Sequence, residues 1–169
     1  MLIIEDGTGK TNSNSYVDVE YADAYFLDRG ITKWADLHDK DARLIRGTDF
    51  IDNVFKWKGK KKTKEQALHF PRINLIDDDG YKVEGIPECL KQAVCEASLL
   101  SNEGTTLYMK ESSKGDIISE DIAGQLRFTY DTKTKIKDKT IYGVINSKLR
   151  GLYIDTSRGR IISGKIERV

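Results

Sequence analysis

The sequence lacks an excess of charge of either sign. Its 169 residues include 28 lysine and arginine residues and 27 aspartate and glutamate residues, giving a formal net charge of +1 at pH 7. Proteins dedicated to nucleic-acid binding usually carry a basic excess, because lysine and arginine make the phosphate contacts. The overall charge therefore argues against a dedicated nucleic-acid binder and leaves only local basic patches to consider.

Cysteine is scarce, and both cysteines fall in a stretch with helical periodicity. Six helical residues would separate the Cα atoms of Cys89 and Cys95 by about 9 Å. An unstrained disulfide needs a separation of less than about 7 Å. We therefore expect two free thiols, which fits folding in a reducing cytoplasm.

Long apolar runs and metal-binding clusters are missing as well. No stretch is long and apolar enough to predict a membrane span. No basic region followed by an apolar run opens the chain, so no signal peptide is expected. His38 and His69 are the only histidines, and neither has Cys, Asp or Glu at a known metal spacing. Because no nucleophile-elbow sequence is present either, we expect no catalytic residue, no metal, no cofactor and no enzyme activity.

One glycine-rich stretch imitates a nucleotide site. GTGKT at 7–11 ends like the phosphate-binding pattern G-x-x-x-x-G-K-[ST], but the residue five before Gly9 is Ile4 and not glycine. NSNS at 12–15 then takes the place of the helix that such a loop needs. We interpret residues 1–17 as an extended, turn-rich N-terminal segment.

A second stretch imitates a calcium loop. DDDG at 77–80 fits part of the EF-hand pattern, but the matching frame puts Leu75 and Ile86 at the first and last ligand positions. Neither side chain offers an oxygen to calcium. The sequence therefore predicts an acidic turn here.

Apolar residues recur at helical spacing in several parts of the chain. The helices expected from this pattern lie at 19–29, 40–55, 87–102 and 140–150. Asp18 is the expected N-cap of the first, and Gly47 in the second indicates close packing against a neighbouring helix. The capping-box pattern Thr63 to Gln66 predicts a further short helix at 64–69.

The pattern changes after Gly104. Strict alternation at 125–130 predicts a strand, and 117–122 is its expected hairpin partner. We divide the chain into the N-terminal segment (1–17), a helical bundle (18–104), a β-hairpin plus helix (105–150) and a C-terminal arm (151–169).

A lysine run is the strongest local electrostatic signal. We define it by its candidate nucleic-acid contacts: Lys56, Trp57, Lys58, Lys60, Lys61, Lys62 and Lys64. Aromatic residues among basic ones can bind a single strand by stacking and phosphate contacts. The other interpretation is a solvated loop with Trp57 turned into the core. The second is favoured because the whole chain lacks a basic excess, and the first is kept as the alternative.

A series of motifs in order resembles a known family. These are EDGTG, NSNSYV, ADAYFLDRG, LIRGTDFID, FKWKGKK, QALHFPR, DGY and IPECLKQAVCEA, which together cover most of residues 4–100. The chain is similar to small tailed-bacteriophage proteins that serve as head-tail connectors (adaptors). Many members carry the label "DnaT-like single-stranded DNA-binding protein".

The resemblance implies a fold and an assembly role. The implied fold class is mainly α, a small helical bundle with a C-terminal β-hairpin and extended N- and C-terminal arms. Copies would form a ring, usually dodecameric, between the portal and a tail-side neck or tail completion protein. The protein would then be found in the virion neck, and in the host cytoplasm during assembly, with non-specific contact to packaged DNA and none to a membrane.

The terminal segments are the expected partner contacts. The candidate residues are Asp6, Gly7, Asn14, Tyr16, Tyr153, Arg158, Arg160, Ile162 and Ile166. Segments that bury little area alone can add area between neighbours in a ring, and a strand-like tail can pair with an exposed sheet edge. The alternative function is single-stranded DNA binding through the lysine run.

Overall fold

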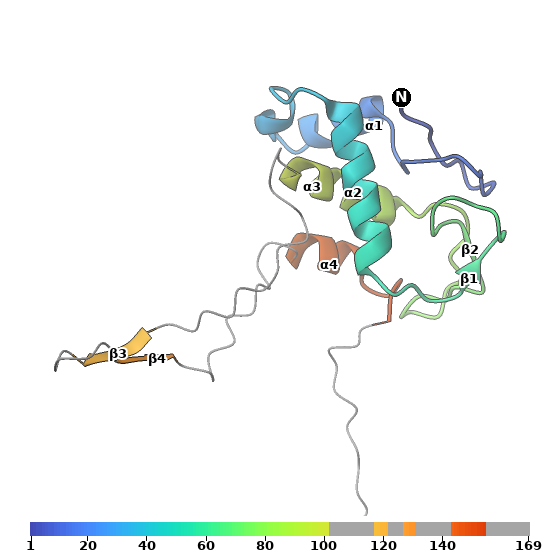
Figure 1. Cartoon of the computed structure of the whole chain (residues 1–169). Coiled ribbons are helices and arrows are strands. Elements are labelled where there is room, and N and C mark those ends of the chain that lie inside the picture. Colours follow the sequence, from blue (N-terminus) through green and yellow to red (C-terminus); the bar gives the residue numbers. More distant parts are fainter. Residues whose placement is uncertain (102–116, 122–126, 131–142, 155–169) are drawn as a thin grey trace, which may run out of the picture.

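The protein is mainly helical, as predicted. The structure, a computed structural model, describes residues 1–101 and 143–154, together with the backbone of 117–121 and 127–130 (Figure 1). Its helices are α1 (Val19–Leu27), the short 3-10 helix η1 (Thr32–Trp34), α2 (Lys40–Val54), α3 (Glu88–Leu100) and α4 (Gly143–Leu149). None of the helices in these ranges is long and apolar enough to cross a membrane.

The helix ends follow the sequence signals. The Asp18 carboxylate accepts a hydrogen bond from the backbone N–H of Tyr21 at 2.7 Å, which caps α1 as expected. Pro87 immediately precedes α3, where its missing N–H costs nothing. Because local caps set these ends, the predicted helices match the structure to within a few residues.

The core lies where α2 crosses α3, and α4 also packs against α3 (Figure 1). Gly47 lies at the closest approach of α2 and α3. A Cβ at this position would be 2.9 Å from the backbone nitrogen of Ser98 and 3.0 Å from the carbonyl oxygen of Val94. The predicted close packing at Gly47 is therefore confirmed. Ile145 and Leu149 of α4 are fully buried in the same core.

The short helix predicted at 64–69 is wrong. The Gln66 side chain does accept from the backbone N–H of Thr63 at 2.9 Å, as a capping box requires. However, Gln66 is 3% exposed, and its amide nitrogen donates to the carbonyls of Leu68 and Pro71 at 2.9 and 3.1 Å. The buried Gln66 side chain thus stabilises a non-helical loop.

A small two-stranded sheet, not predicted from the sequence, closes this loop. Strand β1 (Lys60–Lys61) pairs antiparallel with β2 (Arg72–Ile73), and Lys60 lies opposite Ile73. Gly59 precedes β1 with φ of +69°, and a Cβ there would lie 2.6 Å from the carbonyl oxygen of Ile73. Glycine is therefore needed where the lysine run enters the sheet.

The C-terminal half is described only in part. Strand β3 (Ile117–Asp121) pairs antiparallel with β4 (Arg127–Tyr130). The residues that join them, 122–126, lie outside the described residues, so the hairpin connection stays a prediction. The predicted C-terminal arm beyond 154, with the candidate contacts Arg158, Arg160, Ile162 and Ile166, also lies outside them.

The arm predicted for residues 1–17 is a closed loop in the structure. Ile4 and Ser15 form a parallel bridge, and the backbone N–H of Glu5 donates to the Ser15 carbonyl at 2.9 Å. Tyr16 and Val17 are 1% and 2% exposed. The segment packs on the helical body because its last residues belong to the hydrophobic core.

Candidate functional site

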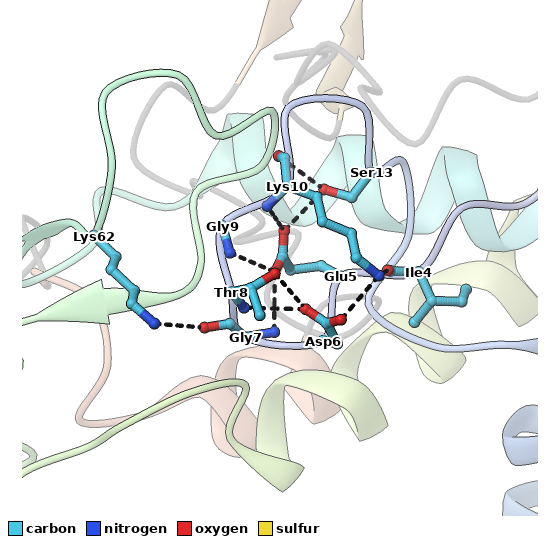
Figure 2. A network of polar contacts seen from close by, with 9 residues as sticks. All are labelled: Ile4, Glu5, Asp6, Gly7, Thr8, Gly9, Lys10, Ser13 and Lys62. Carbon is cyan, nitrogen blue, oxygen red and sulfur yellow. Dashed lines mark hydrogen bonds and ion pairs between the residues drawn. The ribbon is translucent and has the colours of Figure 1, made fainter.

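The EDGTG motif folds around its own glutamate. Glu5 is 2% exposed, and its Oε1 accepts from the backbone N–H groups of Gly7 and Gly9, both at 2.9 Å. Its Oε2 accepts from the Lys10 backbone N–H at 2.8 Å and from Ser13 Oγ at 3.0 Å (Figure 2). Gly7 and Gly9 have φ of +93° and +89°, which turns successive N–H groups toward the carboxylate. We call this loop, residues 5–13, the Glu5 nest.

The outer side of the nest is fixed by Asp6 and Lys10. Asp6 Oδ1 accepts from the hydroxyl and the backbone N–H of Thr8, at 2.6 and 3.1 Å. Lys10 Nζ lies 3.0 Å from Asp6 Oδ2 and donates to the Ile4 carbonyl at 2.9 Å (Figure 2). The Thr8 hydroxyl, and then Lys10, hold the pKa of Asp6 well below its ordinary value. The Lys10 ammonium thus already has protein partners.

The Glu5 nest has the geometry of an anion site whose anion is built in. Convergent backbone N–H groups bind phosphates in other proteins, but here the Glu5 carboxylate occupies that position. This geometry agrees with the interpretation that GTGKT is not a nucleotide loop. Sequence reasoning missed the role of Glu5. The available signal was the pair of glycines two and four residues after an acidic side chain.

The nest is tied to the lysine run. Lys62 Nζ donates to the Gly7 carbonyl at 3.0 Å (Figure 2), and the backbone N–H of Ala67 donates to the Lys10 carbonyl at 2.9 Å. A Cβ on Gly9 would lie 3.1 Å from Thr63 Oγ1. Two motifs that are far apart in sequence therefore form one surface.

Tyr16 connects the N-terminal segment to α2. Its hydroxyl lies 2.8 Å and 3.0 Å from the two carboxylate oxygens of Asp52 and accepts from the backbone N–H of Phe70 at 3.0 Å. Asp52 Oδ2 also accepts from the backbone N–H of His69 at 2.8 Å. Burial raises the pKa values of both Tyr16 and Asp52. Three motifs of the resemblance, NSNSYV, LIRGTDFID and QALHFPR, thus meet at one buried carboxylate.

The aromatic ring of the lysine run faces the core. Trp57 is 6% exposed, its ring centroid lies 4.9 Å from that of Phe70 in an edge-to-face arrangement, and it lies 5.7 Å from that of Phe55. The favoured interpretation, with Trp57 turned inward, is confirmed for this side chain. Its ring faces are therefore not free for base stacking.

The lysines of the run have different environments. Lys58 pairs with Asp78 at 2.7 Å, and Lys61 Nζ reaches the Gln66 carbonyl at 3.4 Å. The side chains that remain exposed are Lys56, Lys60, Lys62 and Lys64. The run is thus a partly engaged basic surface and not a uniform row of free charges.

A pocket of about 450 Å³ opens beside the run, where the chain leaves α2 and enters β1. We call it the Trp57 pocket. Its lining residues are Asp52, Asn53, Phe55, Lys56, Trp57, Lys61, His69 and Arg72. Burial lowers the pKa values of the His69 imidazole and the Arg72 guanidinium. The sequence analysis identified the lysines and Trp57, but it did not predict that His69 and Arg72 lie beside them.

The candidate partner contacts within the described residues differ in exposure. Asp6 is exposed, and Gly7, Asn14 and Tyr153 are half-buried. Asn14 accepts from the backbone N–H of Ile3 at 2.7 Å, and the Tyr153 ring lies 4.9 Å from that of Phe55. Tyr16 is buried, so its side chain offers no free surface to a partner.

The cysteines and the acidic turn are the remaining candidate features. Cys89 and Cys95 are free thiols, as predicted, and burial raises the pKa of Cys95 to about 12. Asp77 Oδ1 accepts from the backbone N–H groups of Asp79 and Tyr81 at 3.1 and 2.8 Å, which forms the expected acidic turn. Across the ranges that the structure describes, no three His, Cys, Asp or Glu side chains are grouped to hold a metal ion.

The family described as "Putative DnaT-like ssDNA binding protein" matches residues 1–169, which is the whole chain. The chain belongs to this family. Comparison of the chain with curated proteins gives no match, and comparison with solved structures gives none either.

Proposed function

We propose that this DnaT-like protein is a structural virion component. It would act as a head-tail adaptor that forms a ring between the portal and the tail, assists head completion and provides the surface for tail joining. Its partners would be the portal protein, a tail-side neck or tail completion protein, and further copies of itself, with twelve as the number implied by the resemblance. Assembly would take place in the host cytoplasm.

The main support is how the motif residues are used. Residues of the motifs that carry the resemblance stabilise the fold. Glu5 fills the nest, Tyr16 and Asp52 are hydrogen-bonded to each other, and Trp57 packs on Phe70. A protein that presents surfaces to partners needs a rigid scaffold, and this use of the motif residues therefore supports the adaptor proposal. The Glu5 nest and the lysine run form such a surface, joined through Lys62 and Gly7.

Binding to the portal tests this proposal. Purified protein is mixed with the portal ring of the same phage, and the complex is measured by size-exclusion chromatography with light scattering. We expect one copy per portal subunit, and a ratio near one in purified virions by quantitative mass spectrometry. Absence from virions, together with no portal complex, would contradict the adaptor function.

A second candidate function is single-stranded DNA binding. It is favoured by the exposed lysines of the run, which lie beside the basic Trp57 pocket, and by the description of the family. Because the Trp57 faces are packed, binding would depend on phosphate contacts and would show little base preference. This function is compatible with an adaptor ring on the path of the packaged genome.

Salt dependence tests the second candidate. Binding of a labelled oligothymidine is measured by fluorescence anisotropy over a range of salt concentrations. Affinity should fall steeply with salt, because each phosphate contact to a single strand contributes a slope of about −0.7 in log K against log salt. Replacing Lys60, Lys62 and Lys64 together with Ala should flatten that slope. Binding that ignores salt, or no binding at low salt, would exclude this function.

A further inference from the structure

The Trp57 pocket has more positive than negative charge. Lys56, Lys61 and Arg72 line it, and Asp52 is the one carboxylate of the lining. Asp52 already accepts from the Tyr16 hydroxyl and the His69 backbone N–H. These bonds and the attraction of Lys61 and Arg72 partly balance the charge of Asp52, and the three cations line an opening of about 450 Å³.

Arg72 is held firmly in this pocket without a carboxylate partner. Its Nε donates to the Lys58 carbonyl at 2.6 Å, and its Nη atoms donate to the carbonyls of Gly59 and His69 at 2.8 and 3.1 Å. No ion pair within the described part of the chain includes Arg72. These contacts fix the guanidinium in position, and the nearby Asp52 carboxylate attracts it without a direct ion pair among the described residues.

Two residues that line this pocket carry a ring nitrogen without a hydrogen-bond partner among the described residues. Trp57 Nε1 and His69 Nδ1 are both buried and have no partner among the described residues. Trp57 as a whole is more than nine-tenths buried. Buried polar groups are usually satisfied, so two unpartnered ring nitrogens in one cationic pocket point to a ligand that brings acceptor oxygens.

We propose that the Trp57 pocket binds one phosphate group of a single-stranded nucleic acid. Trp57 Nε1 and His69 would donate to the phosphate oxygens, and Lys56, Lys61 and Arg72 would balance the charge. This inference rests on the nucleic-acid candidate above and names the site at which that function operates. A strand is favoured over a free anion because exposed Lys60 and Lys64 lie outside the pocket on the same run, within reach of further phosphates.

The two indole N–H groups provide a direct test. In an amide and indole correlation NMR spectrum of the ¹⁵N-labelled protein, Trp34 and Trp57 give separate indole signals, which a Trp34→Phe variant assigns. An oligothymidine of about ten nucleotides is added, a length within the usual site sizes. We expect the Trp57 signal to move and the Trp34 signal to stay, because Trp34 Nε1 already donates to Asp23 at 2.7 Å.

Matched lysine variants give the second readout. Lys61→Met removes a charge that lines the pocket, and Lys64→Met removes an equal charge from the same run outside it. We expect Lys61→Met to weaken oligothymidine binding about tenfold and Lys64→Met about twofold, since only the former loses a placed contact. His69→Ala should also weaken binding while leaving its backbone bond to Asp52 in place.

Three outcomes separate this inference from the function on which it rests. Oligothymidine that binds without moving the Trp57 signal, and equally to both lysine variants, would overturn the pocket and leave DNA binding standing. A Trp57 signal that moves with pyrophosphate in a protein that binds no oligothymidine would overturn the nucleic-acid ligand and the second candidate together. A signal that responds to polyglutamate but not to oligothymidine would assign the pocket to an acidic protein partner and overturn the proposal.

Discussion

The Glu5 nest and the Trp57 pocket are two polar sites on one small protein, and they differ in how their polar groups are satisfied. In the nest, two backbone N–H groups converge on Oε1 of Glu5, and a backbone N–H and a hydroxyl converge on its Oε2. In the pocket, two ring nitrogens have no partner in the described part of the protein. The nest is therefore complete within the chain, whereas the pocket has capacity left for a ligand.

This difference in hydrogen-bond satisfaction distinguishes a structural polar site from a polar site that can bind a ligand. A sequence motif rich in glycine and polar residues suggests a ligand site in either case. What decides is whether the chain supplies the counter-group itself, as Glu5 does for its nest. Tyr16 connects the two regions, because it follows the nest in sequence and its hydroxyl bonds Asp52, which lines the pocket.

Removing the Glu5 carboxylate should have the largest effect. Glu5→Ala leaves the donors of Gly7, Gly9, Lys10 and Ser13 without their acceptor. We expect the free energy of unfolding to fall by about 3 kcal/mol, since each unsatisfied buried group costs roughly 1–3 kcal/mol and the opened loop can be partly hydrated. Urea unfolding measures this loss.

Two controls sharpen the Glu5 result. Glu65→Ala makes the same change at an exposed position and should alter stability by less than about 0.5 kcal/mol. Added acetate should restore part of the stability of Glu5→Ala, more than chloride at equal ionic strength, because the vacated nest binds a carboxylate. Equal losses in the two variants, with no acetate effect, would show that the nest is not an anion site.

The helices were predictable because their signals are local. Apolar spacing placed α2 and α3, and Asp18 and Pro87 marked the starts of α1 and α3 within one residue. Gly47 indicated the contact between α2 and α3, because a side chain at this position would clash with α3. Short-range patterns of this kind predict the secondary structure correctly when the tertiary contacts favour the same local structure.

The candidate sites were less predictable because they are assembled across the chain. Gln66 has the capping-box spacing, but its amide nitrogen donates to the Leu68 and Pro71 carbonyls. The capping-box spacing does not predict these two hydrogen bonds. His69 and Arg72 reach the lysine run only through the pairing of β1 with β2. The inward position of Trp57 was the favoured interpretation, because a chain without a basic excess argued against a stacking role for this ring.

Breaking the link between the two regions should have an intermediate effect. Tyr16→Phe removes the hydroxyl that bonds the Asp52 carboxylate and the Phe70 N–H. We expect a loss of about 2 kcal/mol in the free energy of unfolding, because both groups remain buried without this partner. Thermal or urea unfolding checks this value. Tyr81→Phe, at a side chain that is 73% exposed, is the matched control and should be nearly neutral.

The two tryptophans should differ in a smaller but diagnostic way. Trp34→Phe removes an N–H that donates to Asp23, whereas Trp57→Phe removes one that has no partner among the residues the structure describes. Both changes lose similar packing, so the difference isolates the hydrogen bond. Trp34→Phe should cost about 1.5 kcal/mol more than Trp57→Phe, which is the lower end of the range for a hydrogen bond to a charged acceptor. Equal costs would mean that the Trp57 N–H is satisfied in solution.

The titration of His69 tests the pocket with the smallest change in stability. Burial lowers the pKa of His69 below its unfolded value of about 6.5, against the attraction of Asp52, and Lys61 and Arg72 lower it further. The folded state then binds the proton less readily than the unfolded state, so the stability given by neutral His69 is full above about pH 6.5 and is lost as pH falls.

His69→Gln should remove that loss, and the stability advantage of the wild type over this variant should shrink between about pH 7 and 5. Histidine NMR signals measured over this pH range report the pKa of His69 directly. Pyrophosphate should raise the His69 pKa, because an anion in the pocket favours the protonated ring, and a pKa that stays unchanged would argue that the pocket binds no phosphate.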